Sequence, residues 1–203
     1  MTKAVWGAGL HLAIVVSLGL ASASCGDLTR QGTASSYLIV STLEGASGAD
    51  PEAFGGTLLS DVLTVVNGSA TTFNDLARVK FALGLKDPGT ADSPSAPTQA
   101  NWITVDRYHV RFIRTDGRNA EGADIPYAFD GSFTATVASE TEVGFMLVRH
   151  QAKQEAPLAA LARNGLVVSA IAEVTFYGHD QTGRAVSAVG NLGVSFANFA
   201  DPQ

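Results

Sequence analysis

Apolar and polar side chains alternate along most of the chain beyond residue 35. A period of two is typical of β-strands that bury one face and expose the other. Turn-forming residues separate the alternating runs, and Asn67-Gly68 is a strong signal for a tight turn. A slip in the alternation near Ala82 or Gly84 predicts a β-bulge. Strands are predicted within residues 36–45, 57–66, 74–87, 101–117, 127–138, 141–153, 166–178 and 185–199.

Helical composition is limited to residues 155–165, which end at Asn164-Gly165 and are long enough for one or two turns. Strands do not alternate with helices, so a parallel sheet is not expected. The proline-rich residues 88–99 are expected to be a loop within one domain, because neither half alone has enough strands to close a sandwich. The pattern predicts an all-β fold, an antiparallel β-sandwich of seven to nine strands with one short helical turn.

Residues 174–196 read "VTFYGHDQTGRAVSAVGNLGVSF", a strand, a D-x-x-G turn and a closing strand. This segment resembles the last two strands of immunoglobulin-like domains of bacterial surface proteins. The resemblance implies an immunoglobulin-like β-sandwich. The paired core cysteines of antibody domains are absent, because the chain has a single cysteine, Cys25.

The first 25 residues have the order of a secretory signal peptide. Lys3 is followed by a nearly apolar run over residues 4–20 and then by the small residues 21–24. The apolar run is shorter than the ~20 residues of a membrane-spanning helix. The sequence therefore predicts export.

Two cleavage positions fit this segment. Signal peptidase could cut after Ala23 and leave Cys25 as a free thiol, or the cut could fall before Cys25 and make it a lipidated first residue. The second resembles the lipobox of bacterial lipoproteins, although Ser22 stands where that family usually has leucine. Two or three acyl chains would give stable anchoring, and a lipidated sulfur cannot form unwanted disulfides.

This resemblance divides the chain into a lipoprotein-type signal peptide (1–24), a flexible tether (25–35) and a β-sandwich domain (36–203). Together the features resemble those of uncharacterised bacterial lipoproteins with an immunoglobulin-like domain. The expected location is the periplasm or the cell surface. Gly26 replaces the aspartate of a known inner-membrane retention signal, which favours the outer membrane.

Composition and charge narrow the range of partners. The net charge is −6 and charged residues make up only 16% of the chain. Nucleic acid is not an expected partner, because binding it requires a dense cationic surface. No cofactor motif is present. The expected partners are a membrane, through Cys25, and an envelope protein or glycan.

Catalytic and metal-binding patterns are poorly supported. The histidines lack metal-ligand spacing, and the common nucleophile motifs are missing. Acids do gather in and near the central loops, where a calcium site, a glycosidase pair or simply solvated loop acids are alternative interpretations. The acids concerned are Asp106, Asp116, Glu121, Asp124 and Asp130.

The strand predicted within residues 101–117 carries the candidate binding surface. One parity is aromatic and apolar, with Trp102, Tyr108, Val110 and Phe112. The other carries Arg107, His109 and Arg111 after Ile103 and Val105. The cations either receive an acidic partner, a sugar acid or a lipid headgroup, or pair with acids on neighbouring strands. Trp102 could stack on a sugar ring or lie in the core.

The sequence thus predicts a non-enzymatic envelope lipoprotein in which a tethered β-sandwich binds or supports a partner. Its candidate binding surface comprises Arg107, His109, Arg111 and Trp102. A carbohydrate-binding module and a hydrolase with a site built from loops are the alternatives.

Overall fold

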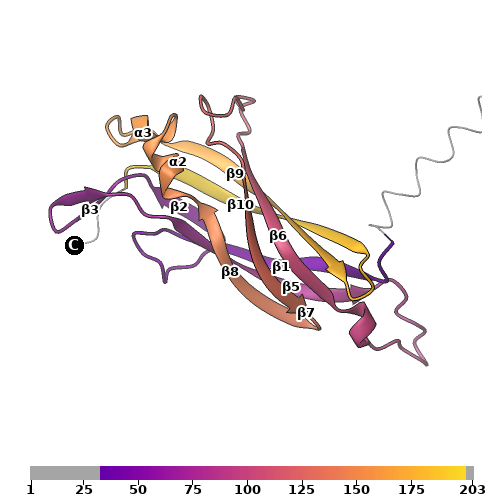
Figure 1. Cartoon of the computed structure of the whole chain (residues 1–203). Coiled ribbons are helices and arrows are strands. Elements are labelled where there is room, and N and C mark those ends of the chain that lie inside the picture. The colour runs from indigo at the N-terminus through magenta and orange to yellow at the C-terminus, as the bar shows by residue number, and fades with distance from the viewer. Residues whose placement is uncertain (1–32, 200–203) are drawn as a thin grey trace, which may run out of the picture. The chain divides into compact units, whose positions relative to one another are not determined.

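The computed structural model describes residues 33–199 (Figure 1). The chain divides into two parts between Thr33 and Ala34. The predicted signal peptide, Cys25 and most of the predicted tether lie outside the described residues. The elements in chain order are β1 (Ser36–Ala46), β2 (Thr57–Asp61), β3 (Thr64–Val66), β4 (Ser69–Thr71), β5 (Asp75–Leu85), the 3-10 helix η1 (Gln99–Asn101), β6 (Ile103–Ile113), β7 (Phe129–Val137), β8 (Glu140–Val148), α2 (His150–Gln154), α3 (Leu158–Leu161), β9 (Val168–Asp180) and β10 (Ala185–Ala197).

Two sheets form the sandwich. One has three strands in the order β1-β5-β8, and the other has five in the order β2-β10-β9-β6-β7. Within the described residues, β2 and β10 pair in parallel, and the other neighbouring strands pair antiparallel. The predicted all-β sandwich is therefore confirmed.

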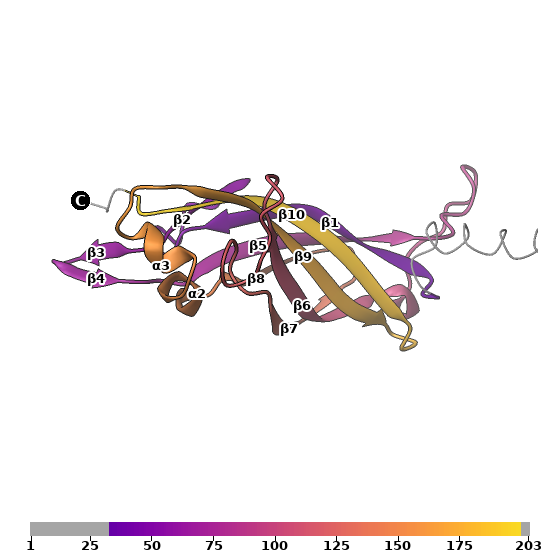
Figure 2. The same ribbon diagram turned by 90° about the horizontal axis from the view of Figure 1, so that it is seen from above.

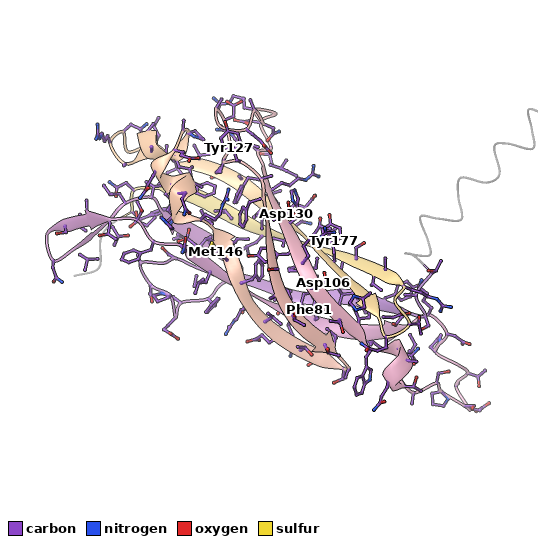
Figure 3. All side chains as sticks on the ribbon, viewed as in Figure 1. Phe81, Asp106, Tyr127, Asp130, Met146 and Tyr177 are labelled. Carbon is purple, nitrogen blue, oxygen red and sulfur yellow. The ribbon has the colours of Figure 1, made fainter. Side chains whose placement is uncertain are left out.

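Aromatic rings from both sheets meet between the layers. Phe81 of β5 meets Phe176 of β9 edge-to-face, with ring centroids 4.9 Å apart. Phe145 of β8 lies 5.5 Å from Phe176 and 4.8 Å from Tyr108 of β6. Phe81 is labelled in Figure 3. Because the rings come from both layers, their burial holds the sheets face to face.

The predicted strand over residues 57–66 is divided into β2 and β3. The Asp61 side chain accepts hydrogen bonds from Leu63 N and Thr64 Oγ1, at 3.4 and 2.7 Å. These local bonds stabilise a break in the strand. β3 then pairs with β4 across Asn67-Gly68, both at positive φ, and this hairpin extends beyond the larger sheets (Figure 2). The described residues thus contain ten strands, compared with seven to nine predicted.

The predicted helical turn within residues 155–165 is present as α3, but the structure has a second short helix and the predicted bulge is not where it was expected. Two short helices are present, and α2 takes residues 150–154, which fall mostly in the strand predicted over residues 141–153. Within residues 33–199, no helix is long and apolar enough to cross a membrane. The predicted bulge near Ala82 is wrong: β5 pairs regularly there, and the register shift lies in β1 between Val40 and Thr42.

The β9–β10 hairpin turns around Asp180, whose side chain is buried. Asp180 Oδ1 accepts hydrogen bonds from Thr182 N at 2.9 Å, Thr182 Oγ1 at 2.6 Å and Arg184 N at 3.0 Å. Burial by itself would raise the pKa of Asp180, but these hydrogen bonds outweigh it and lower the pKa. The ionised carboxylate therefore stabilises the turn.

We expect Asp180→Ala to lower the free energy of unfolding by about 1–2 kcal/mol at neutral pH, because the two amides lose their acceptor. A lowered pKa in the folded state gives stability that is present above the ordinary carboxyl pKa of about 4 and is lost as pH falls below it. The difference in the free energy of unfolding between wild type and variant, measured by urea unfolding, should therefore shrink from pH 7 to pH 3. A difference independent of pH would contradict the role of the ionised carboxylate.

Candidate functional site

The predicted cations lie on the outer face of the five-stranded sheet. Arg107 and Arg111 are exposed and His109 is half-buried, whereas Tyr108 and Val110 between them are buried. Strand β6 lies between β7 and β9, so neighbours on both sides can reach these side chains. We call Arg107, His109 and Arg111 the cationic strip.

Each member of the cationic strip has a partner on a neighbouring strand. Arg111 Nε donates to Glu173 Oε1 of β9 at 2.7 Å, and His109 Nδ1 lies 3.2 Å from Asp130 Oδ1 of β7. The Arg107 guanidinium lies over the Tyr177 ring, 4.6 Å from its centroid. Tyr177 and Asp130 are labelled in Figure 3. The strip is thus a set of cross-strand pairs, in which Glu173 offsets the charge of Arg111.

A bulge at Asp106 turns the strip outward. The register of β6 shifts between Val105 and Arg107 against both β7 and β9. Asp106 is the extra residue of β6 against β9. The residues that face the core are therefore odd-numbered before the bulge, Ile103 and Val105, and even-numbered after it, starting with Tyr108. The expectation that Ile103 and Val105 share a face with the cations is wrong.

The same bulge separates Trp102 from the aromatic face on which it was expected. Trp102 is half-buried just before β6, and its carbonyl oxygen accepts from Gln181 Nε2 at 3.5 Å. It lies five residues before Arg107, about 16 Å along an extended strand. The structure thus places the three cations on one face and leaves Trp102 at the end of the strand.

Gly178 of β9 lies against the bulge. A Cβ atom at this position would overlap Thr104 O and lie 2.9 Å from Val105 Cα. Both are backbone atoms of β6, so the neighbour cannot move aside by changing a rotamer. The bulge that orients the cationic strip therefore depends on a glycine in the next strand.

We expect Gly178→Ala to lower the free energy of unfolding by about 1–3 kcal/mol, the usual cost of overpacking. Gly193→Ala is the matched control, because this β10 glycine belongs to the same sheet and its Cβ would meet nothing closer than Thr57 Cγ2 at 3.7 Å. Urea unfolding of both variants checks the prediction. Equal losses of unfolding free energy in the two variants would show that the bulge does not require glycine at position 178.

Two acids of the central loop, Asp116 and Asp124, are held by arginines or by the loop's own backbone. Asp116 Oδ2 accepts from Arg114 Nη2 and Arg118 Nη2, at 2.5 and 2.8 Å. These hydrogen bonds hold the pKa of Asp116 well below its usual range. Asp124 Oδ2 accepts from Ala120 N at 3.1 Å. Asp106, expected with this group, instead lies 3.4 Å from His179 Nδ1, and Asp130 lies beside His109.

Within residues 33–199, no three His, Cys, Asp or Glu side chains gather closely enough to hold a metal ion. The five acids weighed for calcium or glycoside hydrolysis are therefore not assembled into one such cluster. Asp116 with its two arginines instead orders the loop between β6 and β7.

A buried polar cluster lies elsewhere and was not predicted. Lys153 Nζ of α2 donates to Asp75 Oδ1 of β5 at 2.7 Å and to Asp61 O at 2.8 Å. The two side chains are 1% and 0% exposed. Asp75 also accepts from Ser60 Oγ at 2.6 Å and Gly48 N at 2.8 Å. We call Lys153, Asp75 and Ser60 the buried clasp.

The buried clasp is coupled to the surrounding chain. Burial raises the pKa of the Asp75 carboxyl, against the opposing effect of the Lys153 charge and of the hydrogen bonds that Asp75 accepts. Asp61, whose carbonyl binds Lys153, also accepts from Phe199 N at 3.1 Å through its side chain. The clasp thus ties α2 to β2, β5 and the segment after β10.

One feature of the sequence could have revealed the acid of this clasp, Asp75. Asp75 continues the parity of Ala77, Val79 and Phe81, which are the buried residues of β5. An acid in line with an apolar face requires a buried partner. The partner itself is 78 positions away, and no local pattern marks Lys153.

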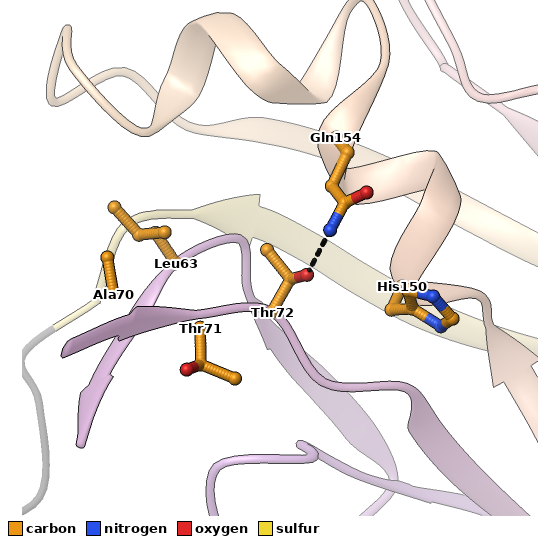
Figure 4. A pocket seen from close by; sticks show the side chains of 6 residues that line it. All are labelled: Leu63, Ala70, Thr71, Thr72, His150 and Gln154. Atoms are coloured by element: carbon orange, nitrogen blue, oxygen red, sulfur yellow. Dashed lines mark hydrogen bonds between the residues drawn. The ribbon is translucent and has the colours of Figure 1, made fainter.

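A shallow groove of about 480 Å³ lies beside α2 and is lined by Leu63, Ala70, Thr71, Thr72, His150 and Gln154 (Figure 4). Gln154 Nε2 donates to Thr72 Oγ1 at 2.8 Å. His150 N donates to Asn74 Oδ1 at 2.7 Å, and His150 Nδ1 lies 3.0 Å from the same oxygen. These polar groups dock α2 against the segment that leads into β5.

Comparison with protein-family models, with curated proteins and with solved structures finds no match for this chain.

Proposed function

We propose that the chain is an exported lipoprotein, anchored through Cys25, whose β-sandwich binds or supports a partner in the cell envelope without catalysing a reaction. The observation that carries the proposal is the order of the first 25 residues: a basic residue, an apolar run, four small residues and then the chain's single cysteine. The resemblance to immunoglobulin-like domains is part of the same proposal.

The start of the domain is compatible with a short tether. Ala34 is the first buried residue described, and it lies nine positions after Cys25. Nine residues span at most about 30 Å when fully extended. A lipid on Cys25 would therefore keep the sandwich close to the membrane, where its partners would be membrane-bound proteins or surface glycans.

The outer face of the five-stranded sheet is the proposed binding surface. Its cations are held in cross-strand pairs with Glu173, Asp130 and Tyr177, so their side chains are ordered before a partner arrives. Pre-ordering lowers the entropic cost of binding. Glu173 and Asp130 already lie beside Arg111 and His109. The surface therefore favours a partner that offers both hydrogen-bond donors and acceptors over a purely acidic one.

Carbohydrate binding is the second candidate, and one observation favours it. Tyr127, in the loop before β7, is 51% exposed and its ring packs against Gly122. A fixed, exposed aromatic ring can stack on a sugar. A glycan array that compares wild type with Tyr127→Ala and Trp102→Ala would show whether either ring contributes to binding. The loop-built hydrolase is less favoured, because Asp116 is held between two arginines.

Metabolic labelling with a palmitate analogue in a bacterial host tests the anchor. We expect the wild type to take up the label and Cys25→Ser to lose it. Ser24→Ala is the matched control, because it keeps a small residue before the cysteine and should label like the wild type.

Two outcomes would contradict the anchor. One is a Cys25→Ser protein that labels as strongly as the wild type. The other is an unlabelled wild type whose mature N-terminus is Ser24, which would establish cleavage after Ala23 and a free thiol at Cys25.

A further inference from the structure

The β3–β4 hairpin projects from the end of the sandwich opposite the start of β1 (Figures 1 and 2). Within the described residues it forms a two-stranded sheet of its own, so no other strand pairs with β4. Residues 65–70 are all exposed, and Val65 and Val66 are 40% and 42% exposed. A hairpin of two strands is marginally stable by itself in water, and a third strand adds stability. The hairpin is therefore open to extension along β4.

The hairpin has none of the features that usually keep a sheet edge from pairing. Native proteins protect exposed edges with charged side chains or proline. Among the edge strands that the structure describes, β1, β2, β7 and β8 each contain at least one acidic residue, whereas β3 and β4 contain neither a charge nor a proline. No charged residue lies between Asp61 and Asp75. Such an edge is typical of a strand that pairs with another chain.

The backbone of β4 directs hydrogen-bonding groups outward at Ala70. Val66 pairs with Ser69 across a two-residue turn, and the pair that closes such a turn exchanges hydrogen bonds. The next pair, Val65 and Ala70, is then a non-hydrogen-bonded pair, because the two kinds alternate along an antiparallel ladder. The N–H and C=O of Ala70 therefore point away from β3, toward the open edge.

We propose that this edge is a contact between two copies of the chain. β4 pairs antiparallel with β4 of a second copy about a two-fold axis at Ala70, and the four strands form one sheet in the order β3-β4-β4-β3. The contact is independent of the proposed anchor, because it uses no residue outside the hairpin.

The sequence of β4 suits pairing with itself. A two-fold axis at Ala70 places Ser69 of each copy opposite Thr71 of the other, and hydroxyl pairs of this kind stabilise antiparallel sheets. Ala70 faces Ala70 at the axis, so two small side chains meet there. No like charges face each other along the strand, because β4 has none. A second copy is therefore complementary to this edge in both side chains and charge.

The base of the hairpin holds β4 in place for this contact. Thr64 Oγ1 at the start of β3 donates to Asp61 Oδ2 at 2.7 Å, and Gln154 Nε2 of α2 donates to Thr72 Oγ1 at 2.8 Å. The groove beside α2 runs along β4 and its continuation, because residues 70–72 line it (Figure 4). A strand that is held extended loses little conformational freedom on pairing, which lowers the cost of association.

Sedimentation equilibrium of the full-length chain, at concentrations up to about 1 mM, tests the proposal. The parent protein for all samples carries Cys25→Ser, so that neither acyl chains nor a disulfide can join two copies, and detergent of matched density is present in excess. We expect a monomer–dimer equilibrium for this parent. It should be weak, because three residue pairs bury less area than a stable dimer needs.

A charge at the axis makes the test specific, because residue 70 of one copy would face residue 70 of the other. Ala70→Lys and Ala70→Glu should each weaken dimerisation about tenfold or more, since like charges then meet. An equimolar mixture of the two variants should dimerise at least as well as the parent, because opposite charges meet. Thr134→Lys adds the same charge to an exposed position of another edge strand, β7, and is the matched control that should leave the equilibrium unchanged.

Three results would overturn the proposal. A parent protein that stays monomeric over the whole range would show that the β4 edge does not bind a second copy, which would leave it to a strand of a different protein. A dimer that persists in Ala70→Lys would place the contact elsewhere on the molecule. A mixture that associates no better than either variant alone would show that residue 70 does not face its counterpart.

Discussion

Lys153→Ala is expected to lower the free energy of unfolding by about 3–5 kcal/mol, the usual effect of removing one partner from a buried ion pair. The Asp75 carboxylate would stay in the interior with hydrogen bonds from Ser60 and Gly48 but without its cation. Asp61 O would lose the donor that Lys153 supplies. Urea unfolding, followed by far-UV circular dichroism, measures the loss.

The exposed pair between Lys80 and Glu140 is the matched control. Lys80→Ala removes one cation from β5, the strand that carries Asp75, but water solvates the acid left behind, so little change is expected. If the free energy of unfolding falls by the same small amount in both alanine variants, the buried clasp does not stabilise the fold. The double variant Lys153→Ala with Asp75→Ala then measures the coupling between the two side chains.

Phe176→Ala is expected to lower the free energy of unfolding by about 3–5 kcal/mol, as for other buried aromatic residues. Phe176 is fully buried and contacts Phe81 and Phe145 of the opposite sheet. Truncation would leave a cavity between the sheets, because residues on two layers cannot collapse into it without changing the spacing of the layers. Urea unfolding again measures the loss.

Val189→Ala is the control for this prediction. Val189 belongs to the same sheet, on β10, but faces outward and is 52% exposed. A change of about 0.5 kcal/mol or less is expected, as is usual for surface substitutions. A loss at Phe176 no larger than that at Val189 would show that the ring cluster does not hold the sheets together.

The sequence predicted the layers of this fold from local pattern. The runs from residue 36, within 101–117 and within 185–199 became β1, β6 and β10 with small changes at their ends. It also predicted the turn at Asn67-Gly68, which has positive φ at both residues. These predictions succeeded because alternation and turn chemistry are properties of a few neighbouring residues.

The candidate sites were predicted less completely. The alternation in residues 101–117 brought Arg107, His109 and Arg111 to one face, as the structure has them. It misplaced Ile103 and Val105, because a single extra residue at Asp106 reverses the parity of everything before it. The identities of Glu173, Asp130 and Tyr177 as partners followed only from the order β7-β6-β9.

The sequence by itself determined that this chain forms strands and where most of them lie. Only the tertiary structure decided that Lys153 is buried against Asp75 and that a glycine at position 178 supports the Asp106 bulge. The physical reason is the range of the interactions. Strand alternation is set by the pleat of the backbone from one residue to the next, whereas a buried ion pair and a bulge depend on which distant segments pack side by side.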